Sequence, residues 1–263
     1  MKITERIKYA LNNSMTMCKR CVLLAMRNLD ALFAGFAQPV LLMILFVYVF
    51  GNSLDVGVAN YVNFIVPGVI LQCIGQCSTI TAISINNDMK NGIIDRFRSM
   101  PITRSSVLIG HALAAVIRNV ITMAFVIGAA FLIGFRPTAD LIHWLLAIGI
   151  LLLYIIAITW LSIIFGLISS SAESAQMIAV VTIMLPYLSS GFVTTESMPS
   201  ALRVFAENQP LTPVIEATRS LLMNTSADGN LILAIMWCIG ILVVSYVLAA
   251  QIYKVKLGSV GAV

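Results

Sequence analysis

Few residues in this chain could carry out chemistry, and they are scattered. The two histidines, His111 and His143, fall in different apolar stretches, and Cys18-Lys-Arg-Cys21 has no second Cys-x-x-Cys pair to complete a metal site. Structural zinc usually takes four ligands, so we interpret the cysteines as packing residues and the histidines as membrane-interface residues. The sequence also lacks the phosphate-binding pattern G-x-x-x-x-G-K-S/T and the catalytic patterns H-E-x-x-H and G-x-S-x-G. We therefore expect no catalytic residue, metal or cofactor in this chain.

Carboxylates are missing from the apolar stretches, where ion-driven transporters place them. No Asp or Glu lies in the core of such a stretch, although proton- and sodium-driven transporters usually bury acidic residues at mid-membrane. The one charged residue inside an apolar stretch is Arg118, whose long aliphatic stem we expect to carry its guanidinium to the membrane surface. The chain therefore has no evident energy source of its own.

The overall composition is that of a membrane protein. Apolar residues make up 60% of the 263 positions and charged residues only 10%, whereas soluble domains average roughly 25% charged residues. Lipid tolerates such a surface and water does not. The net charge of +5 does not predict nucleic-acid binding, because Lys and Arg form short clusters beside apolar stretches, as on the cytoplasmic side of membrane proteins. We expect membrane lipid, and no nucleic acid, as a partner.

Six stretches are long and apolar enough to cross a bilayer as helices. They are Ala31–Phe50, Tyr61–Ile85, Val107–Phe135, Leu141–Ile168, Ala175–Val193 and Leu231–Ile252. We predict an all-α membrane protein with a single transmembrane domain over residues 1–263: a cytoplasmic segment 1–30, six spans within 31–252 and a tail 253–263. With the N-terminus inside, the inner segments hold 12 Lys and Arg residues and the outer segments hold 3. This asymmetry predicts that both termini are cytoplasmic.

Shorter helices are predicted outside the spans. Apolar residues recur at helical spacing from Met15 to Leu29, which indicates an amphipathic helix on the inner leaflet. A short cytoplasmic helix should begin at Asp88 and end before Pro101, and it either docks into a soluble partner or lies on lipid headgroups. The external segment 194–230 should form two short helices, Ser200–Asn208 and Pro213–Met223, that dip into the membrane boundary.

Two of the predicted spans carry polar side chains. In Tyr61–Ile85, the residues Gln72, Gln76 and Thr79 follow the spacing i, i+4, i+7 and therefore share one helix face. In Ala175–Val193, Gln176 and Ser189 with Pro186 indicate a second polar and kinked wall. Because polar groups are costly against lipid, these faces should meet either a water-filled translocation path or another helix.

Two loop regions carry a resemblance to a known family. The segment Asp88–Gly110, with Gly92, Arg96, Ser99 and Pro101, resembles the cytoplasmic region of type-2 ABC export permeases. The external stretch before the last span resembles the corresponding loop of that family, and daunorubicin-resistance-type drug-export permeases are the most similar branch. The residues that carry this second likeness are Asn208, Pro210, Pro213, Glu216 and Arg219. Together with the six-span layout, the likeness covers essentially the whole chain.

The resemblance implies a non-enzymatic permease subunit in a bacterial cell membrane that exports an amphipathic or hydrophobic compound. A separate ATP-binding cassette ATPase would supply ATP and Mg²⁺, and a second permease chain, identical or homologous, would complete the path. By the residues alone, an ATP-independent channel or scaffold is the alternative. The implied coupling helix carries Asp88, Gly92, Ile93, Ile94, Asp95, Arg96, Phe97 and Pro101, the connector helix Lys19, Arg20 and Arg27, and the path Gln72, Gln76, Thr79, Gln176, Pro186 and Ser189.

Overall fold

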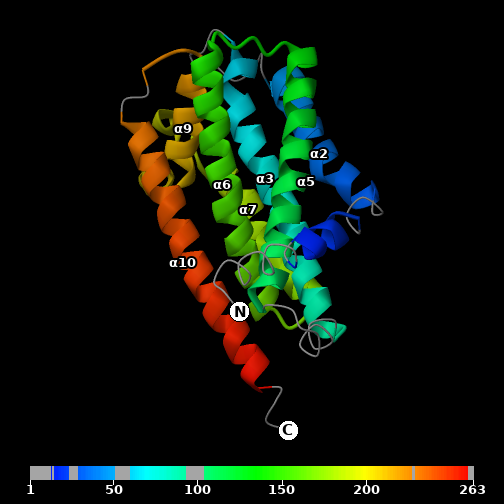
Figure 1. Ribbon diagram of the computed structural model, residues 1–263. Coiled ribbons are helices and arrows are strands. Elements are labelled where there is room, and N and C mark those ends of the chain that lie inside the picture. The colour runs from blue at the N-terminus through cyan, green and yellow to red at the C-terminus, as the bar shows by residue number, and fades with distance from the viewer. Residues whose placement is uncertain are drawn as a thin grey trace.

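The computed structural model describes residues 13, 15–23, 29–50, 60–92, 104–226 and 229–259. Every regular element in these ranges is a helix, as Figure 1 shows. A helical segment over 15–23 is followed by α2 (Leu29–Ile44) with the π-helix η1 (Leu45–Phe50), α3 (Tyr61–Lys90), α5 (Arg104–Ile133), α6 (Leu141–Ile168), α7 (Ala172–Met184) with the 3₁₀ helix η2 (Leu185–Leu188), η3 (Thr195–Ser197), α8 (Ser200–Asn208), α9 (Leu211–Leu222) and α10 (Asn230–Ser259). The predicted all-α fold class is confirmed for this part of the chain.

Four helices are long and apolar enough to cross a membrane: α3, α5, α6 and α10. The bounds of α6 are those predicted from hydropathy, and the other three begin within three residues of the prediction. Two shorter apolar helices, Gly35–Val49 and Ala172–Leu188, occupy the remaining predicted spans. Four membrane-length helices are thus present in the described ranges, and the count of six spans stays a prediction.

Helix α3 is the centre of the bundle. It contacts α2, α5, α6, α7 and α9, and its most apolar 18-residue stretch is 78% buried, against 17% for α10. Glycines allow the closest contacts: a Cβ on Gly75 would lie 2.6 Å from the carbonyl oxygen of Thr182 in α7, and one on Gly68 equally close to that of Gly191. Small residues of this kind let membrane helices approach backbone to backbone. The side chains of α3 therefore face mostly protein.

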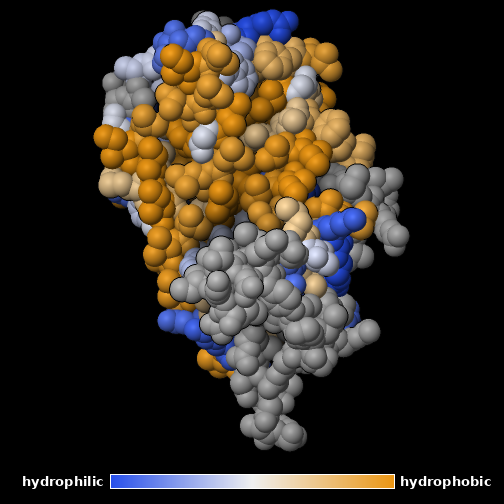
Figure 2. Space-filling model, viewed as in Figure 1, coloured by the Kyte–Doolittle hydropathy of each residue, from blue (hydrophilic) through white to orange (hydrophobic). Residues whose placement is uncertain are grey.

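The helices α3, α5, α6, α7 and α10 run in alternating directions between the two ends of the bundle (Figure 1). At the Asp88 end, where α3 and α6 finish and α5 begins, the Asn86 side-chain amide donates to the carbonyls of Gly166 at 3.2 Å and Ser169 at 2.8 Å. At the α9 end, the Thr138 amide donates to the Leu222 carbonyl at 3.1 Å. Figure 2 shows hydrophobic residues over the middle of this face, with hydrophilic residues toward both ends. This is the surface pattern of a helical membrane protein.

The two short helices predicted before the last span are both present. Helix α8 has the predicted bounds, and α9 begins at Leu211 rather than at Pro213. Helix α9 packs against α3, α6 and α10 with most of its residues buried, whereas α8 is largely exposed. The described part of segment 194–230 is therefore folded protein, and α9 is part of the bundle core.

Candidate functional site

Three segments meet at the carboxylate of Asp88. Arg20, from the helical segment 15–23, donates from Nη1 to Oδ2 at 2.8 Å and from Nη2 to Oδ1 at 3.1 Å. The Nε2 of His111, on α5, lies 3.0 Å from the same Oδ2, and an ionised carboxylate can only accept, so His111 donates. The hydrogen bond with Asp88 raises the pKa of Arg20. We call Arg20, Asp88 and His111 the Asp88 cluster; it joins the N-terminal helical segment to α3 and α5.

The Asp88 cluster corrects two predictions. Asp88 does not begin a new helix, because α3 continues to Lys90 and turns at Gly92, where a positive φ of 64° favours glycine. His111 was expected to face the membrane interface, but it faces protein: it is 5% exposed, because segment 15–23 covers the start of α5. The other predicted coupling residues, Ile93, Ile94, Asp95, Arg96, Phe97 and Pro101, lie outside the described residues, as does Arg27.

The predicted amphipathic helix is described over residues 15–23. Met17, Cys18 and Cys21 are buried, whereas Lys19 is exposed. Its buried face rests on α5, since a Cβ on Gly110 would fall 2.4 Å from the Cβ of Met17. One face of this segment therefore packs on protein, whereas Met15, part of the predicted apolar face, is 66% exposed; an amphipathic helix on the inner leaflet stays a prediction.

The polar face of α3 points into the bundle. Gln72 is 1% exposed and its side-chain amide donates to the Tyr187 hydroxyl on η2. Thr79 is also buried, and Gln76 is half-buried. The Gln72 Oε1 and Thr79 Oγ1 have no hydrogen-bond partner among the described residues. The polar face of α3 therefore packs against the same chain, and two of its side-chain oxygens could still accept a hydrogen bond.

The polar residues predicted on the fifth span are not brought together. Gln176 is exposed near the start of α7, where the neighbouring Ala175 packs with Ala82 of α3. Ser189 is buried after η2: its hydroxyl donates to the Pro186 carbonyl at 2.5 Å and accepts from the Gly191 amide at 3.2 Å. Pro186 and Ser189 therefore shape a turn, and only Gln176 lies on an open face.

Arg118 is buried in the bundle, contrary to the prediction that it reaches the membrane surface. Its Nη2 donates to the Cys77 carbonyl at 3.0 Å and to the Thr81 hydroxyl at 2.6 Å, both on α3. It is 7% exposed, and in the described part of the chain it pairs with no carboxylate. A charge at this depth is costly and is usually functional. Sequence reasoning missed this site because its acceptors lie on another helix.

The motif predicted before the last span forms a clamp at the α9 end. Arg219 donates to Glu216 at 2.6 Å, to the Phe64 carbonyl at 3.1 Å and to the Ser190 carbonyl at 2.7 Å, and it lies 3.9 Å over the Phe64 ring. Pro210 and Pro213 flank the start of α9, where proline is well tolerated. The Asn208 side-chain amide donates to the Val204 carbonyl in the last turn of α8. The motif therefore locks α9 onto the start of α3.

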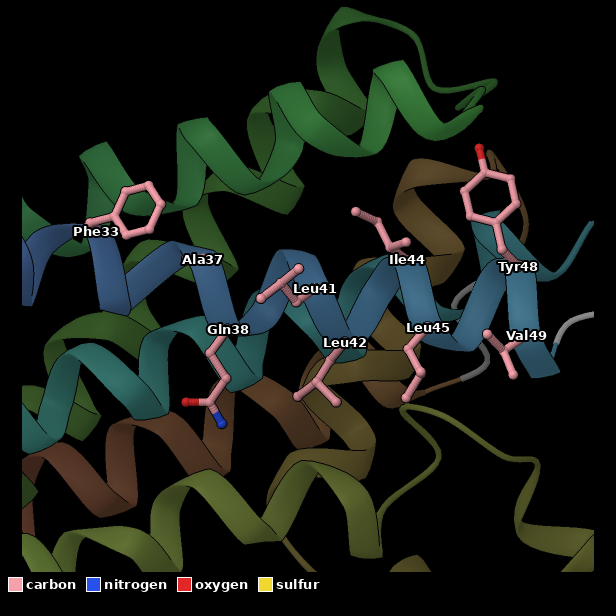
Figure 3. A pocket seen from close by; sticks show the side chains of 9 residues that line it. All are labelled: Phe33, Ala37, Gln38, Leu41, Leu42, Ile44, Leu45, Tyr48 and Val49. Atoms are coloured by element: carbon pink, nitrogen blue, oxygen red, sulfur yellow. The ribbon is translucent and has the colours of Figure 1, made fainter.

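Among the described residues, no helix covers one face of α2 and η1. Figure 3 shows the hollow along it, lined by side chains from α2 and η1 alone, among them Phe33, Leu41 and Tyr48. These three side chains are 64–65% exposed. Helix α7, which packs on α3 as α2 does, exposes Met177 and Val181. Within the described ranges these apolar faces meet no other part of the chain, so they are available to lipid or to another protein.

The fold and these clusters define a polytopic helical membrane protein whose apolar central helix carries several buried polar side chains. Its described residues contain no group of three potential metal ligands. The family model for ABC-2 type transporters matches residues 13–223. The chain therefore belongs to the ABC-2 type transporter family, whose members are membrane permeases of ABC transporters. The family suggested by the two loop motifs is confirmed.

Two relatives are similar over most of their length. The chain is 26% identical over 220 residues to the daunorubicin resistance ABC transporter permease protein DrrB1 of Streptomyces coeruleorubidus, covering 83% of this chain and 78% of that protein. It is 27% identical over 233 residues to the "Probable doxorubicin resistance ABC transporter permease protein DrrC" of Mycobacterium tuberculosis, covering 87% and 83%. Both are membrane subunits named for drug resistance.

Proposed function

We propose that this chain is the permease subunit of an ATP-driven exporter for amphipathic or hydrophobic compounds. The family match over residues 13–223 carries the proposal, and the drug-resistance names of the relatives support the cargo class. The chain would form one domain of six spans in a cell membrane, with both termini in the cytoplasm. A separate ATP-binding cassette subunit would bind ATP and Mg²⁺, since this sequence has no phosphate-binding loop.

Work from the ATPase would enter at the Asp88 end. Residues 93–103 connect α3 to α5, and the Asp88 cluster ties the last turn of α3 and the first part of α5 to segment 15–23. A displacement of the connecting segment would therefore move these helices together, as a rigid-body shift. Because α3 contacts five other helices, the shift would reach most of the bundle. ATP must favour one arrangement over the other for this to drive transport.

The cargo path would form between two permease chains. The uncovered apolar face of α2 and the exposed side of α7, including Gln176, need a partner or lipid. Gln76 is half-buried on α3, the helix against which α7 packs. A second chain facing these surfaces would enclose a largely apolar path with a few polar groups. Such a path fits a hydrophobic or amphipathic cargo.

Co-purification tests the proposal. The tagged permease should bring its ATPase subunit with it from native membranes, and Phe97→Asp should weaken this assembly because a charge replaces an apolar docking residue. Leu202→Asp is the matched control, since Leu202 lies on α8 and is 46% exposed at the α9 end. If the same amount of ATPase were recovered with both variants, Phe97 would not be a residue through which the permease docks on the ATPase. A chain that moves its cargo without any ATPase would instead favour the channel alternative.

A further inference from the structure

An aromatic groove lies between α5, α6 and α10, away from the uncovered face of α2. Trp160 of α6 and Tyr246 of α10 meet edge to face, with ring centroids 4.8 Å apart. The groove has a volume of about 310 Å³, at the lower limit of the roughly 300–1,000 Å³ that ligand sites occupy. The remaining lining residues are Leu108, Ile109, Ala250, Tyr253 and Lys254.

The groove runs from the apolar interior toward the membrane boundary. Lys254 lies two residues after Ile252, where the apolar stretch of α10 ends, whereas Tyr246 lies eight residues before Lys254, deeper in that stretch. At 1.5 Å per residue, the groove spans about 12 Å along the helix axis. Tyr and Trp are typical of membrane boundaries, where an amphipathic ring faces both lipid and water. One end of the groove is thus at headgroup level and the other is in hydrocarbon.

The mouth of the groove is basic and has no acidic neighbour on its own helices. None of the helices α5, α6 and α10 contains an Asp or Glu. Lys254 is exposed, and in the part of the chain that the structure describes it pairs with no carboxylate. Basic pockets between membrane helices bind anionic lipid headgroups. The charge at this mouth therefore complements a phosphate group.

We propose that this groove binds an anionic phospholipid, with one acyl chain lying along the Trp160 and Tyr246 rings and the phosphate at Lys254. A second copy of the chain is a poorer occupant, because a helix about 10–12 Å across does not enter so small a volume. Wall residues Leu108, Trp160 and Tyr253 are each less than 9% exposed, which makes the site largely preformed. The lipid would hold α10 against α5 and α6 at the Asp88 end.

The test uses the full chain in detergent, with phosphatidylglycerol and phosphatidylcholine of identical acyl chains as probes. Native mass spectrometry should show preferential retention of phosphatidylglycerol. Lys254→Gln should reduce that preference about fivefold, since one surface lysine contributes about 1 kcal/mol to anionic-lipid binding. Ala250→Trp should abolish retention of both lipids, because the indole fills the groove.

Val244→Trp is the matched control, because Val244 is 57% exposed on another face of α10. It should retain phosphatidylglycerol as the unmodified chain does. Equal retention of the two lipids by the unmodified chain, or retention by Ala250→Trp equal to that by Val244→Trp, would overturn the proposal. Should Ala250→Trp fail to fold, an unchanged lipid preference in Lys254→Gln, whose exposed side chain leaves packing intact, would overturn it alone.

Discussion

The Asp88 cluster predicts a large stability loss for a small change. Asp88→Ala removes the acceptor of two hydrogen bonds from Arg20 and one from His111. Hydrogen bonds to charged groups contribute about 1.5–3 kcal/mol each. The Arg20 side chain is 29% exposed, so water can replace part of its lost hydrogen bonding. The His111 side chain is only 5% exposed, so water cannot readily replace its acceptor. We expect a loss of about 2–4 kcal/mol in unfolding free energy.

Thermal unfolding in detergent measures this loss. For a chain of this size, it corresponds to a melting temperature lower by roughly 5–15 °C. Asn87→Ala is the matched control, because Asn87 is the adjacent residue on α3 and is exposed. If the Asp88→Ala and Asn87→Ala variants had the same melting temperature, the Asp88 cluster would not stabilise the contact among the three segments, and our reasoning would be refuted. A double-mutant cycle with Arg20→Ala should show coupling, since the two residues contact directly.

Three further predictions concern the packing of α3 and its polar face. Gly75→Ala should lower stability by about 1–3 kcal/mol through its clash with α7, whereas Gly149→Ala, with open space around its Cβ, should not; equal melting temperatures would contradict this. Arg219→Lys should cost about 1.5–3 kcal/mol, because one ammonium cannot replace the contacts of the guanidinium fork, and unchanged unfolding would refute the clamp. Gln72→Leu with Gln76→Leu should alter cargo preference in export assays while ATPase binding persists; unchanged export of all cargoes would assign both residues to packing.

Much of the fold could be predicted from hydropathy. The bounds of α6 and α8 were predicted to the residue. Helix α6 is a long apolar stretch whose start is capped by the Asp140 side chain, and α8 begins directly after Pro199. The short helix α9 was predicted from its prolines and apolar period. The four long helices could be predicted directly from the lengths of their apolar stretches. Helices α2 and α7 are shorter than predicted, because each changes to another helix type before its apolar stretch ends.

The polar clusters could not be predicted, because hydropathy gives the depth of a residue and not its neighbours. From the sequence, the long side chain of Arg118 was expected to reach the membrane surface. In the structure it instead donates to the Cys77 carbonyl and the Thr81 hydroxyl on α3. Asp88 suited a helix start by residue type, but its partners Arg20 and His111 lie on other segments. In both cases the deciding contact joins residues distant in sequence.

The central claim is that this permease exports its cargo only with energy from a partner ATPase. The most direct test places the chain and its ATPase subunit together in liposomes and follows the movement of daunorubicin, the compound that appears in the name of one relative. We predict transport with ATP and Mg²⁺, and none when ATP is omitted or the ATPase is absent. Equal transport by the permease alone would contradict the account.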